Sequence, residues 1–140
     1  MYGKPFPRAA ETLKAVEAGQ MIRIGTHVDA GFRVMTEWGE WKVGMLRYNE
    51  RFSHLGEMER HLLTDEVFVL VSGKATLYTD TEAVAMEIGN TYTVPVGVWH
   101  HIVVSEDALV TVVENRNTSI ENTEKKYFEE KESITCLPLK

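Results

Sequence analysis

The stretch GNTYTVPVGVWH, residues 89–100, decides the fold of this chain. Gly89 allows a turn, and Thr91–Val94 has the β-branched and aromatic composition of a strand. Pro95 and Gly97 predict a tight corner, because proline fixes φ and glycine tolerates positive φ. His100 then begins a second strand, so this corner holds its imidazole at a fixed place on a β wall.

Alternation along that second strand assigns side chains to its two faces. If His100 points inward, Ile102 and Val104 do too. His101 then points the other way, and we expect it at the outer face or at a subunit contact. Trp99 also faces opposite to His100.

A second informative stretch lies one hairpin earlier and reads ERHLLTDEVFVLVSG, residues 59–73. Glu59 and His61 are two residues apart and therefore share a face of a strand. Glu66 opens the apolar strand 67–71. Gly73 supplies the hairpin turn into the next strand, Ala75–Tyr78.

Together, and in this order, the two stretches resemble the signature motifs of the cupin superfamily. By count, seven of the ten motif positions match: His61, Glu66, Gly73, Gly89, Pro95, Gly97 and His100. The departures are Ser53 for the opening glycine, Glu59 for the first histidine and Val104 for the closing asparagine. The resemblance covers about residues 41–114 and implies an all-β, single-domain cupin barrel of the jelly-roll type.

The resemblance also implies a site for one divalent metal ion. Carried over position by position, its ligands are Glu59, His61, Glu66 and His100. Two imidazoles and two carboxylates suit Mn, Fe, Ni or Zn, and the additional carboxylate favours Mn²⁺ or Fe²⁺. Neither a catalytic residue nor an organic cofactor is assigned.

Several side chains near these motifs leave alternatives open. Glu59 could instead face solvent or form a salt bridge with Arg60 or Arg47. His54 could lean into the pocket as a replacement ligand, although a role in a loop is the plainer interpretation. His27 lies in a turn and receives no chemical role.

Two further positions complete the candidate residues. Arg47 and Tyr48 are the residues to inspect for substrate contact, and alternation places one of them inside. Cys136 is interpreted as a tail residue rather than a nucleophile, because nothing places an acid–base partner beside it.

Outside the motifs, short β-rich runs recur about every ten residues with turn residues between them, which favours an antiparallel barrel or sandwich. Residues 8–18 predict a short N-terminal helix that ends at Gly19. The polar tail 115–140 predicts a solvated helix or strap. Its Tyr127 and Phe128 could dock part of it on the barrel or on a second subunit. The expected strands are Met21–Ile24, Phe32–Met35, Trp41–Tyr48, Val67–Val71, Ala75–Tyr78, Ala83–Glu87, Thr91–Val94, Trp99–Val104 and Leu109–Val113.

Composition limits the kind of protein this is. At 140 residues, the chain predicts one domain, 1–140, with its barrel core at about 41–114. The net charge of −6 argues against nucleic acid or an anionic membrane as a partner. One cysteine excludes an intrachain disulfide, and we see no apolar run for a signal peptide or a membrane span, so we expect a cytoplasmic protein.

Two functional hypotheses remain. The first is a metal-dependent enzyme that acts on a small polar metabolite, such as a sugar derivative or an organic acid. The second is a non-catalytic cupin that binds a small molecule and has a degenerate or empty metal site, which the exchanges at Glu59 and Val104 favour. The resemblance and the open barrel edge also predict a homodimer.

Overall fold

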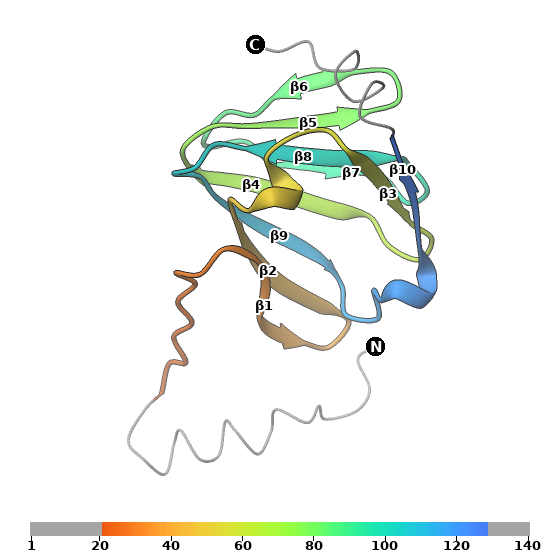
Figure 1. Cartoon of the computed structure of the whole chain (residues 1–140). Helices are drawn as coiled ribbons and strands as arrows, with labels where there is room; N and C mark the ends of the chain where they lie inside the picture. Colours follow the sequence, from red (N-terminus) through yellow and green to blue (C-terminus); the bar gives the residue numbers. More distant parts are fainter. Residues whose placement is uncertain (1–20, 129–140) are drawn as a thin grey trace.

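The chain folds into two five-stranded antiparallel sheets, which a computed structural model describes for residues 21–128 (Figure 1). Short 3-10 turns occupy η1, Glu50–Phe52, and η2, Ile120–Asn122. The described strands are β1 Gly31–Trp38, β2 Trp41–Arg47, β3 Glu57–His61, β4 Glu66–Ser72, β5 Ala75–Thr79, β6 Ala83–Ala85, β7 Tyr92–Val94, β8 His100–Val104, β9 Leu109–Asn115 and β10 Thr123–Tyr127.

The first sheet has the strand order β1-β2-β9-β4-β7. Its strands β4 and β9 are almost continuously apolar, yet alternation still decides which side chains reach the core. In register, Phe68 lies opposite Val112 and Glu66 lies opposite Glu114, and all four side chains are buried. A pair of carboxylates therefore continues the inner face of the sheet beyond its apolar part.

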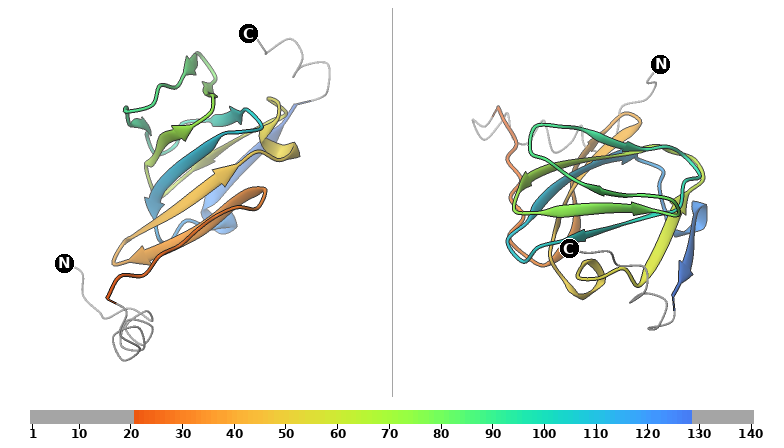
Figure 2. Two further views of the ribbon diagram at one scale, coloured as in Figure 1. Left: turned by 90° about the vertical axis from the view of Figure 1, so that its left-hand side faces the viewer. Right: turned by 90° about the horizontal axis from the view of Figure 1, so that it is seen from above.

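The second sheet has the order β10-β3-β8-β5-β6. Strands β5 and β8 pair along five positions, from Ala75 with Val104 to Thr79 with His100. By contrast, β3 meets β8 at a single described pair, Glu59 with His100. The hairpins β1–β2 and β5–β6 lie at opposite ends of the molecule (Figures 1 and 2).

The core lies between the two sheets. Ile102 and Val104 belong to it, which confirms that the His100 face of β8 points inward. A smaller cluster of Leu55, Met58 and Tyr78 packs elsewhere with Val103 and with Trp99, which was expected to face opposite to His100. The main cluster contains Leu46, Phe52, Phe68, Leu70, Ala75, Leu77, Met86, Val94, Ile102, Val104, Ala108, Val110 and Val112.

The all-β prediction is confirmed, with three differences in the described residues. Met21–Ile24 forms no strand. Strand β3 was missing from the expected list, although Glu59 and His61 were expected to share a strand face. Residues 123–127, expected in a solvated helix or strap, form the edge strand β10 paired with β3.

Some predictions lie outside the described residues. The helix at 8–18 and Cys136 belong to this group. Among residues 21–128, no helix has the length and apolar character needed to cross a membrane. The cytoplasmic location and the single domain stay predictions.

Candidate metal centre

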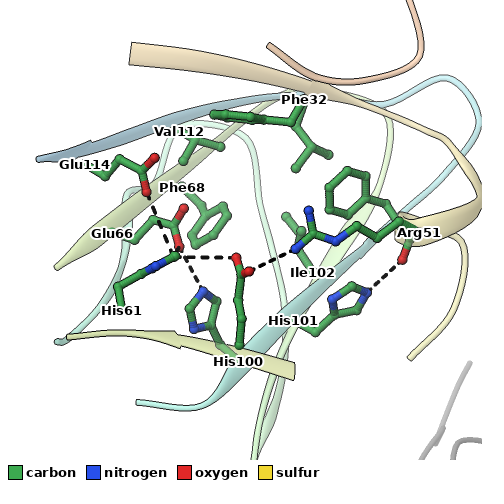
Figure 3. A pocket seen from close by; sticks show the side chains of 13 residues that line it. Phe32, Arg51, His61, Glu66, Phe68, His100, His101, Ile102, Val112 and Glu114 are labelled. Atoms are coloured by element: carbon green, nitrogen blue, oxygen red, sulfur yellow. Dashed lines mark hydrogen bonds and ion pairs between the residues drawn. The ribbon is translucent and has the colours of Figure 1, made fainter. Parts of the chain in front are cut away.

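The four residues expected around a metal ion converge at one point inside the sandwich. Figure 3 labels three of them, His61, Glu66 and His100. Each offers one ligand atom, and these atoms all lie within 4.8 Å of one another. Glu59 and His61 come from β3, Glu66 opens β4 and His100 opens β8. Segments separated along the chain thus meet because the two sheets bring the ends of β3, β4 and β8 together.

Glu66 is the centre of this group. Its Oε1 lies 3.0 Å from His61 Nε2 and 2.8 Å from His100 Nε2. Burial alone would raise the pKa of Glu66, but its hydrogen bonds to the two imidazoles hold that pKa at about 2. Burial likewise opposes the charged form of His61, whereas the hydrogen bond and charge of Glu66, helped by Glu59 and Glu114, raise its pKa.

The outer ring nitrogens of both histidines are fixed by other groups. His100 Nδ1 donates to the carbonyl of Val98 at 2.9 Å, and a 2.9 Å hydrogen bond joins His61 Nδ1 to the hydroxyl of Thr123. Such partners orient an imidazole and direct its other nitrogen to a metal ion. Strand β10, which supplies Thr123, therefore helps to build the centre.

This donor set fits a divalent cation. A neutral His100 that donates through Nδ1 presents a lone pair at Nε2. That lone pair faces Glu66 Oε1 at 2.8 Å, so the two atoms need either a proton between them or a cation that both would bind. The same mixture of imidazole and carboxylate donors is common for Mn, Fe, Ni and Zn.

Glu59 has a partner on each side. Its Oε1 accepts from Arg51 Nη2 at 3.0 Å, and its Oε2 lies 3.5 Å from His61 Nε2. The proposed partners Arg60 and Arg47 were wrong, because Arg60 pairs with Glu124 and Arg47 donates to the carbonyl of His27. One carboxylate oxygen of Glu59 therefore remains turned toward the imidazole.

Glu114 is a site residue that sequence reasoning missed. Its side chain is buried and lines the same cavity, with Oε1 3.9 Å from His61 Nε2. Burial and the neighbouring Glu66 carboxylate raise the pKa of Glu114 to about 7. The signal was present, since Val110, Val112 and Glu114 are alternate residues of one strand and share its inner face.

The cavity beside these polar groups has a volume of about 90 Å³. That is room for several water-sized groups and hence for a compact ligand. Apolar side chains form much of its wall: Phe32, Leu46, Phe52, Phe68, Ile102 and Val112.

Two further histidines, His101 and His54, lie close to the centre in sequence but do not belong to the ligand set. His101 is not at an exposed outer face, because it is 3% exposed, lines the cavity and donates from Nε2 to the carbonyl of Arg51 at 3.0 Å. Burial lowers the pKa of His101 to about 4. His54 is exposed and hydrogen-bonded to Ser53, so it serves the loop and does not replace a ligand.

The remaining candidates lie away from the cavity wall. Neither Arg47 nor Tyr48 lines it, and Tyr48 packs against the core instead. His27 is buried and donates from Nε2 to the carbonyl of Gly31 at 2.8 Å. That contact holds the segment before β1 and gives His27 a structural role.

Comparison with known proteins supports the fold and no closer relationship. No family model matches the chain, and no curated protein sequence does. Among solved structures, Streptomyces PAC13 with uridine has a TM-score of 0.61 and 16% identity, covering 78% of this chain and 90% of that protein. Pac13 is described as a nucleoside dehydratase.

Two other solved structures resemble the chain in the same way. A cupin-2 domain protein from Shewanella frigidimarina has a TM-score of 0.52 and 19% identity, covering 78% of this chain and 99% of that one. KdgF from Halomonas has a TM-score of 0.52 and 14% identity, and the match covers 66% of this chain and 87% of that protein. The chain therefore has the cupin fold that its two motifs predicted.

Proposed function

We propose that this cupin-fold chain is a metal-dependent enzyme that acts on a small polar metabolite. The observation that supports it best is the position of Glu66 Oε1, within hydrogen-bonding distance of the inward Nε2 atoms of both His61 and His100. Glu59, His61, Glu66 and His100 would hold the ion. A bound divalent ion would supply Lewis-acid chemistry toward substrate oxygens.

The protein's own groups would position the substrate and shield it. Apolar side chains around the cavity exclude water, which strengthens electrostatic interactions within it. Arg51 and Glu114 line the same cavity and present polar groups beside the four proposed ligands. One similar solved structure is a nucleoside dehydratase, so small-molecule chemistry occurs on this fold.

Metal analysis of the purified chain tests the proposal. We expect about one equivalent of Mn, Fe, Ni or Zn, and we expect its loss in the His61→Ala, His100→Ala double variant. A matched control is His54→Ala, which removes an exposed imidazole outside the cavity. A wild-type chain that binds none of these ions, even after their addition, would contradict the metal centre.

A non-catalytic binding protein is the second candidate, and one contact favours it. Arg51 holds an oxygen of Glu59 at 3.0 Å, so this carboxylate already has a cationic partner. On this alternative, the chain binds a small molecule in its cavity without a metal. Ligand binding that is unchanged in the double variant would support it.

We also propose a homodimer. Strand β1 is an edge strand of its sheet and carries exposed Val34 and Trp38. The face of this sheet that points away from the core is apolar as well. A second copy of the chain could cover the edge strand and this outer face. This outer face includes Val43, Met45, Val67, Val69, Thr111 and Val113, which alternate with inward residues.

A further inference from the structure

One buried oxygen atom in the cavity wall lacks a hydrogen-bond partner among residues 21–128. Glu114 Oε1 is buried and has no hydrogen-bond partner among the described residues, while the whole side chain is only 6% exposed. Its other oxygen, Oε2, lies 3.7 Å from Lys42 Nζ. Buried acceptors without a partner are rare in native proteins, because each costs free energy. Oε1 therefore marks a position where a ligand would donate a hydrogen bond.

The charges around the cavity restrict what that ligand can be. Three carboxylates line it, those of Glu59, Glu66 and Glu114. The guanidinium of Arg51 also lines it, but Arg51 already binds Glu57 at 2.9 Å and Glu59 at 3.0 Å. Because the bound ion would offset the charges of Glu59 and Glu66, Glu114 is the carboxyl group left to face a ligand, and a ligand carboxylate cannot donate a hydrogen bond to its Oε1. An uncharged ligand with hydroxyl donors would meet acceptors.

The apolar part of the wall adds a shape requirement. Phe32 lines the cavity and is 40% exposed, so its ring lies at the opening. The ring packs against Gly44, where a Cβ would lie 2.4 Å from two ring atoms, so the absence of a side chain there gives the ring its place. Such a ring suits the C–H face of a ligand whose hydroxyls point elsewhere.

We propose that the site takes an uncharged polyhydroxy compound, and that Glu114 orients it by accepting a hydrogen bond from one of its hydroxyls. The C–H face of the ligand packs on Phe32 at the opening. This inference rests on the proposed function, because the four proposed metal ligands line the same cavity as Glu114; Figure 3 labels His61, Glu66 and His100 beside it. It separates the two substrate classes considered from the sequence, and selects sugar-like compounds over organic acids.

Ligand titrations followed by saturation-transfer difference NMR on the Zn²⁺-loaded full chain test this inference. The probes are glycerol, erythritol and xylitol, each paired with the acid of the same carbon skeleton: glycerate, erythronate and xylonate. We expect one polyol to bind at least ten-fold more tightly than its acid. We also expect saturation to reach its C–H protons, which face Phe32.

Two variants make the test specific. Glu114→Met removes the acceptor at similar volume, and we expect polyol binding at least ten-fold weaker with unchanged Zn²⁺ stoichiometry. Phe32→Ala alters a partly exposed side chain, so it keeps the test usable if the first variant does not fold, and it should weaken polyol binding too. Glu87→Met, at an exposed position outside the cavity, is the matched control and should change nothing.

The possible failures are distinct. Zn²⁺ binding without any polyol binding, acids that bind as tightly as polyols, or full polyol affinity in Glu114→Met would each overturn this inference and leave the metal centre standing. If Glu114→Met does not fold, full polyol affinity in Phe32→Ala would overturn it. Absence of Zn²⁺ binding would instead contradict the proposed function on which the inference rests.

Discussion

At the scale of single residues, the centre depends on atoms that face away from it as much as on those that face inward. The Nδ1 atoms of His61 and His100 are held by Thr123 and by the carbonyl of Val98. These contacts fix the orientation of each ring before an ion arrives. The side chain of Thr123 is thus the most direct test of how the geometry is maintained.

Thr123→Val removes the hydroxyl and keeps the shape of the side chain. We expect metal affinity to fall by about ten- to a hundred-fold, as is usual when a partner of a ligating histidine is lost. Isothermal titration calorimetry with Zn²⁺ measures it. Thr76→Val, a strand threonine away from the cavity, is the control. Equal affinities of the two variants would show that Thr123 does not orient His61.

His101 predicts a pH dependence of stability. Burial lowers its pKa from 6.5 to about 4 in the folded chain, so the unfolded chain binds the proton more readily. The buried, neutral His101 therefore causes no loss of stability above pH 6.5. As the pH falls from 6.5 toward 4, the free energy of unfolding decreases by at most about 3 kcal/mol because of this residue. Urea unfolding of wild type and His101→Gln in EDTA, at pH 7 and pH 5, measures it. An equal loss of stability in both proteins on acidification would contradict the prediction.

The residue scale also shows where sequence reasoning succeeded and failed. The resemblance of the two motifs to cupin signatures implied that His61, Glu66 and His100 lie together, and the fold does bring the strands that carry them into contact. Glu114 was missed because it lies outside both motifs, although its strand alternation pointed inward. Arg51 was missed because its side chain extends from a 3-10 turn, where no periodicity predicts direction.

At the scale of elements, strands with two apolar faces or clear turns were predictable, and polar edge strands were not. Strand β10 reads Thr-Glu-Lys-Lys-Tyr, a composition that also suits a solvated helix. Its pairing with β3 is decided by contacts far apart in sequence, and charged side chains are common on edge strands. Local pattern alone could not choose between these structures.

The turn between β4 and β5 depends on Gly73, and Gly89 provides a matched comparison. Both have positive φ, but a Cβ on Gly73 would lie 2.5 Å from the Cα of Ala108, whereas a Cβ on Gly89 would meet nothing. Gly89→Ala should therefore cost about 1–2 kcal/mol for conformation alone. Gly73→Ala should cost clearly more, because backbone must move. Urea unfolding of both variants checks this, and equal losses would contradict it.

At the scale of the whole molecule, the fold leaves one sheet apolar on both sides. Strands β4 and β9 read as nearly continuous apolar runs, a pattern typical of strands covered on both faces. The inner face packs in the core, and the homodimer proposal assigns the outer face to a second copy. The motifs predicted the barrel, whereas nothing in them specifies which surface meets a partner.

The homodimer makes a prediction about mass in solution. Sedimentation equilibrium should give twice the 15.9 kDa of one chain. Val69→Lys places a charge on the outer face of β4 and should shift the protein toward the monomer. Val84→Lys, in the other sheet, should not. A wild-type chain that sediments as a monomer at high concentration would exclude the dimer.

The sparse pairing of β3 with β8 has a mechanical consequence. These strands share one described backbone pair, Glu59 with His100, so little of the ladder joins β3 and β10 to the rest of their sheet. An ion bound by side chains of β3 on one side and of β4 and β8 on the other would link β3 to the rest of the molecule. Amide protons of β3 should then exchange with solvent much faster in EDTA than in Zn²⁺, while those of β9 exchange alike in both.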